Sequence, residues 1–163
     1  ILILAITQRQ YRFKFTIALA IELTNMTTKQ QIQDFLLSDF PQTQCRVESI
    51  AKHQASVSHP IGFAQLRPGG TVSGPVLMEV ADVALYVAIL AEIGLVGLAV
   101  TTNLSINFLR KPQADQDIVG ECRLIKVGKK LIVGEVSLYS KGSHDVVAHA
   151  VGTYSIPPKE QLP

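Results

Sequence analysis

The long apolar run over residues 75–93 restricts the fold more than any other feature of the sequence, because it contains only three charged side chains. Pro75 suits the first turn of a helix, and Gly94 suits a helix end. A helix that is apolar on almost every side is either enclosed within a domain or spans a membrane. A carboxylate near the middle of a membrane span, as Asp82 would be, is costly. The sequence therefore predicts a helix buried inside a soluble domain.

Four runs rich in Val, Ile, Leu and Thr follow this helix, and the short loops between them are typical of antiparallel strands. We expect strands over residues 98–109, 117–127, 131–140 and 145–156. Looser alternation of apolar and polar residues predicts one more strand over residues 44–58, before the helix. One helix followed by a meander of antiparallel strands forms an α+β domain. The simplest packing is a strongly curved sheet that wraps around helix 75–93.

A shorter helix is predicted over residues 28–38, where Thr28 and Gln31 have the spacing of a capping box. We expect this helix to cover an edge or an end of the sheet. The segment Arg67-Pro68-Gly69-Gly70 is predicted to form a turn, because its two glycines can take positive φ angles.

Residues 1–25 differ from the rest of the chain, since they hold two short apolar stretches with charged residues between them. Neither stretch reaches the ~20 residues needed to cross a bilayer, and no clear signal-peptide cleavage site is present. We expect Met26 to be the working start, residues 1–25 to be an extension, and residues 26–163 to form a single domain. The alternative is an extra strand, because residues 11–19 carry apolar side chains with a period of two.

Charge and cysteine content disfavour several classes of protein. The net charge of +2 arises within residues 1–25, and the remainder of the chain is neutral. With no Lys or Arg cluster longer than Lys129–Lys130, a nucleic-acid-binding surface is disfavoured. Cys45 and Cys122 lie far apart, which excludes a disulfide scaffold and a cysteine-based zinc site and fits the reducing cytoplasm.

Known catalytic motifs of other enzyme classes are missing from the sequence. No two histidines are spaced like metal ligands on one helix face, so we expect no metal site and treat all four histidines as structural or exposed. The chain also lacks Gly-x-Ser-x-Gly and the glycine patterns that bind nucleotide phosphates, which disfavours serine hydrolases and nucleotide-driven enzymes.

Two segments together resemble a known enzyme family. Residues 73–84, Ser-Gly-Pro-Val-Leu-Met-Glu-Val-Ala-Asp-Val-Ala, resemble the active-site helix of hotdog-fold acyl-CoA thioesterases, where His-Gly-Gly is followed by Leu-Ala-Asp. Residues 102–112 are similar to the next strand of that family, which ends in Asn-Phe-Leu-Arg-Pro. The resemblance extends over residues 44–156, and the nearest branch is the PaaI-like group of phenylacetyl-CoA thioesterases.

The resemblance implies a fold, a partner and a substrate. The fold would be the hotdog, in which a curved antiparallel sheet holds one long helix. The protein would be a homodimer whose two sheets join, or a dimer of dimers, with active sites at the subunit interface. The substrate would be an acyl-CoA thioester, with no further cofactor and with neither nucleic acid nor a membrane as a partner.

The chemistry of thioester hydrolysis suits two residues of the long helix. Asp82 lies about two turns into an apolar helix, where a carboxylate loses hydration and becomes more basic, so it is our candidate base or nucleophile. Gly74 lies at the helix N-terminus, where free N–H groups favour an oxyanion. The alternative for Asp82 is a structural carboxylate that is hydrogen-bonded to a neighbouring strand.

Further residues are candidates for the site with less specific signals. Glu79 is either a helper or a carboxylate that meets solvent, and Thr101 or Thr102 is either a water-holding residue or an ordinary strand residue. Ser73 replaces the family's usual His and is expected to cap the helix with its hydroxyl, and Arg67 replaces a common Asn. Cationic side chains would hold coenzyme A phosphates unless they are simply solvated. The remaining candidates for substrate binding are Val76, Asn107, Arg110, Lys111, Lys129 and Lys130.

Two other functions of hotdog proteins compete with hydrolysis. A dehydratase or isomerase would need a histidine in the helix region, and residues 73–93 contain none. A non-catalytic protein that binds acyl-CoA or lipid is the stronger alternative, because Ser73 and Arg67 depart from the family pattern. Steady release of thiol from acyl-CoA would distinguish an enzyme from a stoichiometric binder.

Overall fold

The buried helix is present as α3, Gly74–Ile93, in a computed structural model that describes residues 27–158. Every residue from Val80 to Leu90 is buried except Asp82. The helix ends at Gly94, whose φ of 95° belongs to the left-handed region that glycine tolerates best. Among residues 27–158, no helix combines the length and apolar character that crossing a membrane requires. The interpretation of residues 1–25 as an extension lies outside the described residues.

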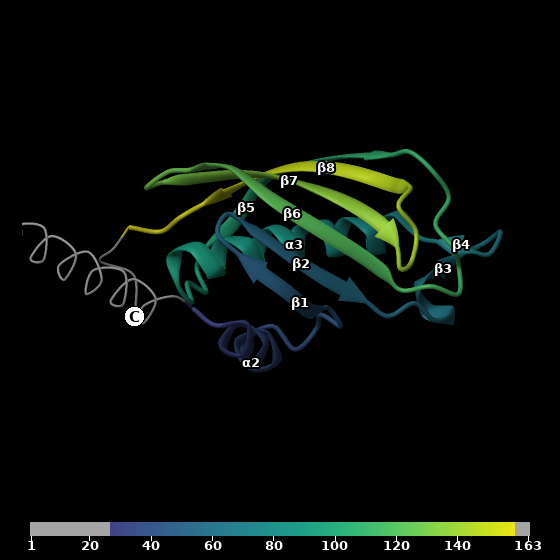
Figure 1. The fold of residues 1–163 in the computed structure, drawn as a ribbon, viewed down its shortest axis with the longest axis horizontal. Helices are drawn as coiled ribbons and strands as arrows, with labels where there is room; N and C mark the ends of the chain where they lie inside the picture. Colours follow the sequence, from purple (N-terminus) through teal and green to yellow (C-terminus); the bar gives the residue numbers. More distant parts are fainter. Residues whose placement is uncertain (1–26, 159–163) are drawn as a thin grey trace, which may run out of the picture.

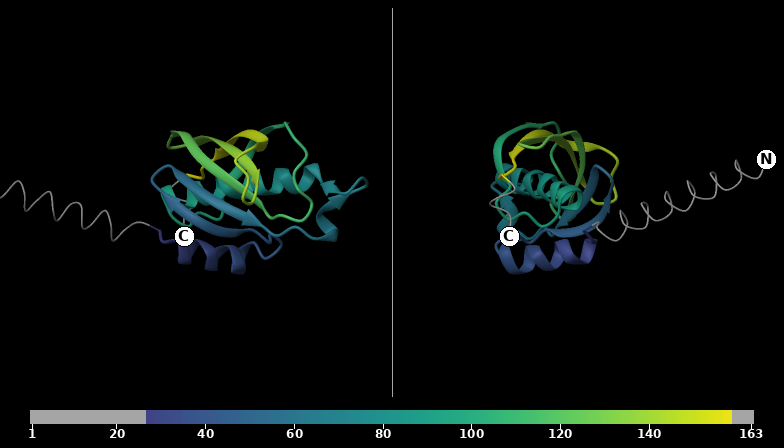
Figure 2. Two further views of the ribbon diagram at one scale, coloured as in Figure 1. Left: turned by 45° about the vertical axis from the view of Figure 1, so that its right-hand side comes forward. Right: turned by 90° about the vertical axis from the view of Figure 1, so that its left-hand side faces the viewer.

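A curved antiparallel sheet wraps around α3, as the end-on view in Figure 2 shows. Within residues 27–158 this sheet has six strands in the order β1-β2-β6-β7-β8-β5. Their bounds are Arg46–Ala51 (β1), Gln54–His59 (β2), Val100–Phe108 (β5), Ile118–Val127 (β6), Leu131–Ser140 (β7) and Val146–Ser155 (β8). A separate small hairpin, β3 (Leu66–Arg67) and β4 (Thr71–Val72), follows the short 3-10 helix Phe63–Gln65 and precedes α3 (Figure 1). The arrangement is the expected hotdog fold.

The prediction of one strand over residues 44–58 was wrong, because the chain forms a hairpin of β1 and β2 there. The turn falls at Lys52-His53, which carries no Gly, Pro, Asn or Asp to mark it. His53 takes a φ of 59°. The side chain of Glu92, at the far end of α3, accepts a hydrogen bond of 3.2 Å from the His53 N–H. A contact distant in sequence therefore stabilises a turn that local chemistry does not indicate.

The predicted meander was correct only for β6, β7 and β8. Strand β5 pairs with β8, from Val100 opposite Ser155 to Phe108 opposite Ala148, and it does not pair with β6. After β5 the chain crosses to the other side of β7 and β8 before it forms β6, which then pairs with β2. Strand β5 consequently lies at one edge of the sheet and β1 at the other.

Helix α2, Lys29–Asp39, covers the β1 edge of the sheet and leaves the β5 edge uncovered (Figure 2). The predicted capping box between Thr28 and Gln31 is present. The side chain of Gln33 accepts a hydrogen bond of 2.8 Å from the Val47 N–H of β1. Exposed edge strands tend to pair with other chains, and a covering helix prevents this at β1.

Glycines on neighbouring strands allow α3 to approach the sheet closely. Gly134 of β7 and Gly152 of β8 lie directly opposite each other. A Cβ added at Gly134 would lie 2.5 Å from Cδ1 of Leu85, and one added at Gly152 would lie 2.6 Å from Cδ2 of the same side chain. Because Leu85 is fully buried, it has no free space into which it could move.

We expect Gly134→Ala to lower the free energy of unfolding by about 1–3 kcal/mol, the usual cost of overpacking a core. In a Leu85→Ala background the same substitution should cost less, because the closest of the groups that the new Cβ meets is gone, and the contacts of 3.2 Å with the Arg123 carbonyl oxygen and Cδ2 of Leu124 remain. Urea unfolding of the four proteins measures both effects. Gly62→Ala is the control, since its new Cβ would meet only Oε1 of Gln65 at 3.5 Å. Equal costs of Gly134→Ala in both backgrounds would contradict the proposed contact.

Candidate active site

Asp82 interrupts the buried part of α3 and hydrogen-bonds to two strands. The hydroxyl of Thr101 on β5 donates to Asp82 Oδ1 at 2.7 Å. The hydroxyl of Tyr154 on β8 donates to the same Oδ1 at 2.9 Å and lies 3.3 Å from the Asp82 carbonyl oxygen. Within residues 27–158, Asp82 Oδ2 accepts no hydrogen bond. Both donors therefore converge on one oxygen and leave the other available for chemistry.

A β-bulge in β5 turns Thr101 toward Asp82. Thr101 lies opposite Tyr154, and the pairing then shifts so that Asn103 lies opposite Thr153 and Thr102 has no partner residue. Side chains alternate between the two faces of a strand, and an extra residue reverses that alternation. The structure thus brings Thr101, and not Thr102, to Asp82. The Thr102 hydroxyl instead donates to the Thr153 carbonyl at 3.1 Å.

Tyr154 was not among the residues predicted from the sequence. It is only 3% exposed, and its ring stacks on Tyr86 of α3 with a centroid distance of 5.8 Å and an interplanar angle of 16°. Burial raises the pKa of the Tyr154 hydroxyl, and the nearby Asp82 charge raises it further. The hydroxyl therefore stays protonated and acts as a hydrogen-bond donor throughout the physiological pH range.

A cavity of about 410 Å³ opens beside Asp82. Its wall is formed by the C-terminal end of α2, the Asp82 side of α3 and the beginning of β5. Most of the side chains that line it are either aromatic or small. The lining residues are Phe35, Asp39, Phe40, Asp82, Tyr86, Gly97, Ala99, Val100, Thr101 and Tyr154. This volume lies within the range of sites that bind small molecules.

The N-terminus of α3 borders a second cavity of about 410 Å³ that is distinct from the first. Gly74 lies against the ring of Phe108, because an added Cβ would be 3.3 Å from Cζ of that ring. Three cationic side chains also line this cavity, namely Arg67, Arg110 and Lys111. Within residues 27–158 none of the three forms an ion pair with a carboxylate. The second cavity is therefore suited to an anionic group.

The expected capping hydroxyl of Ser73 was wrong, although Ser73 does occupy the N-cap position of α3. Its side chain makes no capping hydrogen bond. A capping side chain bonds the N–H of the second or third helical residue. Here the second helical residue is Pro75, which has no N–H, so only the N–H of Val76 remains as a possible partner and Ser73 does not bond it.

The two main candidates, Gly74 and Asp82, do not face a common cavity within one chain. They are eight residues apart on α3, which is about 12 Å along a helix axis. Strand β5 runs beside them in the opposite direction, with Thr101 at the Asp82 end and Phe108 at the Gly74 end. A single thioester carbonyl cannot contact both residues of the same chain.

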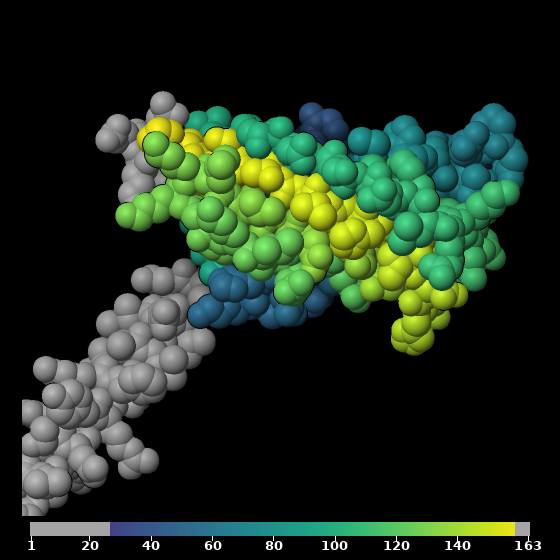
Figure 3. All heavy atoms as spheres, turned by 90° about the horizontal axis from the view of Figure 1, so that it is seen from above, coloured from purple at the N-terminus to yellow at the C-terminus, as the bar shows by residue number. Residues whose placement is uncertain are grey.

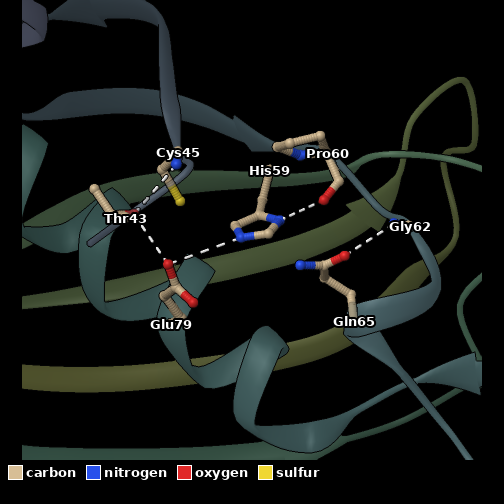
Figure 4. A network of polar contacts seen from close by, with 7 residues as sticks. All are labelled: Thr43, Cys45, His59, Pro60, Gly62, Gln65 and Glu79. Carbon is tan, nitrogen blue, oxygen red and sulfur yellow. Dashed lines mark hydrogen bonds and ion pairs between the residues drawn. The ribbon is translucent and has the colours of Figure 1, made fainter. Parts of the chain in front are cut away.

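Glu79 belongs to a separate polar network, which Figure 4 shows. The Thr43 hydroxyl donates to Glu79 Oε1 at 3.0 Å, and Nε2 of His59 lies 3.8 Å from the same oxygen. His59 is 2% exposed, and its Nδ1 is 2.7 Å from the Pro60 carbonyl oxygen, so Nδ1 carries a hydrogen. Glu79 lines neither of the two cavities and is held toward β2 and the segment before β1.

The remaining predicted residues fall into two groups at opposite ends of β5. Lys129 and Lys130 lie in the turn between β6 and β7, next to the end of β8 that pairs with Val100. Arg110 and Lys111 follow the other end of β5, where the Arg110 guanidinium donates to the Val146 carbonyl at 3.0 Å. Val76 is half-buried on α3 near Gly74, and Asn107 is exposed on β5 opposite His149.

The part of the chain that the structure describes has no cluster of metal-ligating side chains, and its two cysteines are buried. No group of three or more His, Cys, Asp or Glu side chains in residues 27–158 could hold a metal ion. Both cysteines are free and buried. Burial raises the pKa of the Cys45 thiol to about 11 and that of the Cys122 thiol to about 12. Neither thiol is a nucleophile at neutral pH.

Comparison with known proteins identifies relatives in sequence and in structure. A family model described as the thioesterase superfamily matches residues 69–147. A proposed thioesterase of Silicibacter sp. TM1040 is 42% identical, and its crystal structure has a TM-score of 0.74 over 80% of this chain and 92% of that one. A proposed esterase of Saccharolobus solfataricus is 28% identical over 135 residues, 83% of each chain. The phenylacetic acid degradation protein PaaI of Thermus thermophilus shares the fold, with 21% identity and a TM-score of 0.62 over 72% of this chain and 97% of its own.

We expect the folded protein not to react with the thiol reagent DTNB at about pH 8, because both thiols are buried and protonated. In guanidinium chloride both cysteines of each chain should react. Absorbance of the released thionitrobenzoate measures this. Fast reaction of the folded protein would contradict the burial of Cys45 and Cys122. If the expectation holds, the cysteines of the folded protein will not interfere when DTNB is used to measure thiol released from a substrate.

Proposed function

The chain belongs to the thioesterase superfamily, and from that premise we propose that it hydrolyses acyl thioesters of coenzyme A. The observation that carries this proposal is the environment of Asp82. It is the only half-buried carboxylate in the enclosed part of α3, its Oδ1 is held by two donors, and it borders a cavity of about 410 Å³. A carboxylate held in this way is suited to activate a water molecule or to attack a carbonyl.

We further propose that the site is completed by a second copy of the chain, joined at the uncovered edge of β5. Two identical edge strands related by a twofold axis pair antiparallel. This pairing sets the Val100 end of one β5 beside the Phe108 end of the other. Asp82 of one subunit would then face Gly74 of its partner, which removes the separation found within one chain. The exposed apolar residues Val100, Phe108 and Leu109 at this edge support the proposal.

In the proposed reaction the thioester carbonyl lies between the two helices. Asp82 accepts a proton from water while the resulting hydroxide adds to the carbonyl carbon, or its carboxylate adds to that carbon directly. The N–H of Gly74 and the positive end of the α3 dipole stabilise the oxyanion. When the oxyanion collapses, the C–S bond breaks and the sulfur leaves with its electron pair and takes up a proton. The products are a carboxylic acid and coenzyme A.

The two cavities suggest how the substrate lies in this site. The aromatic wall of the first cavity, formed by Phe35, Phe40 and Tyr86, suits the acyl group. The cations suit the phosphates of coenzyme A. In the proposed dimer, Arg110 and Lys111 of one subunit approach the end of the sheet that carries Lys129–Lys130 of the other. The free cysteines agree with our proposal of a cytoplasmic enzyme.

A non-catalytic acyl-CoA-binding protein is the second candidate. The observations that favour it are the Ser73 hydroxyl, which does not cap α3, and Arg67, which stands where an Asn is common in the family. A binder would take up acyl-CoA in proportion to its sites and would release no thiol. The same panel of acyl-CoA substrates tests both candidates, because an enzyme releases thiol continuously.

Asp82→Asn keeps the side-chain volume but removes the charge and the basicity. We expect kcat to fall at least ~100-fold, the scale of a positioned acid–base group. KM should change much less, because coenzyme A is held mainly by other residues. The melting temperature and kcat are measured on the same preparation. A purely structural role of Asp82 predicts the reverse, a less stable protein whose folded fraction has the kcat of the wild type.

Mixing two inactive variants tests whether two chains share one site. Asp82→Asn removes the carboxylate, and Gly74→Pro removes the proposed N–H donor at a helical position that accepts proline. Ser73, with φ of −72° and ψ of 149°, already has the extended conformation that precedes proline. Random reassembly of the two variants should restore about a quarter of the wild-type activity, since half of the dimers are mixed and each holds one intact site. No recovery in dimers shown to be mixed would contradict a shared site.

A further inference from the structure

We propose that Tyr154 is a positioning residue that acts with Thr101 to fix Asp82, so that Oδ2 is the oxygen that takes part in the reaction. This inference rests on the proposed function. It assigns a role to a residue at the end of β8 and chooses between the two carboxylate oxygens.

Convergence of two donors on one oxygen is the first observation that supports this role. Thr101 and Tyr154 approach Asp82 Oδ1 at 2.7 and 2.9 Å. Hydrogen bonds to a charged group are stronger than those between neutral groups, and two of them restrict rotation of the carboxylate about its χ2 bond. Oδ2 is then held at a defined place beside the cavity. Correct orientation of a reacting group is worth a large part of many enzymatic rates.

The rigid support of the Tyr154 hydroxyl is the second observation. Tyr154 lies directly opposite Thr101 on β5 and opposite Ile132 on β7, so strands flank it on both sides. Its ring stacks on Tyr86, which belongs to the same helix as Asp82. A site built on packed strands and helices is held more precisely than one built on loops. The hydroxyl also lies 3.3 Å from the Asp82 carbonyl oxygen, which ties it to the main chain of α3.

Substitutions that remove only the hydroxyl groups test this proposal. Tyr154→Phe keeps the stacked ring, and Thr101→Val keeps the shape of the side chain. We expect each to lower kcat at least ~10-fold with little change in KM, because misplacing a reacting group affects the chemical step more than binding. Thr101→Ser should restore most of the lost kcat. Tyr139→Phe is the matched control, since Tyr139 is half-buried on β7 and lines a hollow away from Asp82.

The Asp82→Asn background separates positioning from a general effect on the fold. If Tyr154 acts through Asp82, Tyr154→Phe should cause no further loss of the residual kcat of Asp82→Asn. The same fold-loss in both backgrounds would overturn the proposal, as would a wild-type kcat for Tyr154→Phe. If the wild-type protein is active and either of these two results is obtained, the role of Tyr154 is wrong but the proposed hydrolase function is not. A wild-type protein that releases no thiol would overturn the function and this inference together.

Discussion

Enclosure of α3 is the constraint on which the rest of the structure depends. A helix with buried residues on almost every side cannot border solvent, so the sheet must curve around it. The close approach of Leu85 to two glycines shows how little space is left between helix and sheet. In such surroundings an unpaired carboxylate would be costly, and hydrogen bonds from β5 and β8 offset that cost at Asp82. The candidate site thus lies at Asp82, the one residue between Val80 and Leu90 that is only half-buried.

The opposite directions of α3 and β5 explain why Gly74 and Asp82 of one chain line different cavities. Gly74 lies at the Phe108 end of β5 and Asp82 at the Thr101 end, so the proposed oxyanion donor and the proposed base of one chain are kept apart. In the proposed dimer, pairing of two β5 edges about a twofold axis would bring Asp82 of one chain near Gly74 of the other. The β1 edge, by contrast, lies beside α2, whose Gln33 side chain accepts a hydrogen bond from the Val47 N–H of that strand. The covered β1 edge and the uncovered β5 edge therefore favour the proposed self-association through β5, the strand that carries Thr101.

Local signals predicted the helices well, and distant contacts explain the failures. The capping box at Thr28 and the proline and glycine that bound α3 act within one turn, so the sequence reveals them. The turn at His53 depends on Glu92, and the place of β5 depends on pairing with β8. Tyr154 was missed for the same reason. Its contact with Asp82 arises from the pairing of β8 with β5 and β7 over α3, which no pattern near residue 154 indicates.

The departures of Ser73 and Arg67 from the family pattern affect only one end of the divided site. Both lie at the Gly74 end, whereas Asp82 and its two donors belong to the other. The proposed oxyanion donor is the main-chain N–H of Gly74, which a change of a neighbouring side chain does not remove. Arg67 adds donors and a positive charge to a cavity that already holds two cations. Arg67 therefore makes that cavity more suited to anions, and neither change removes the groups to which we assign the proposed hydrolysis.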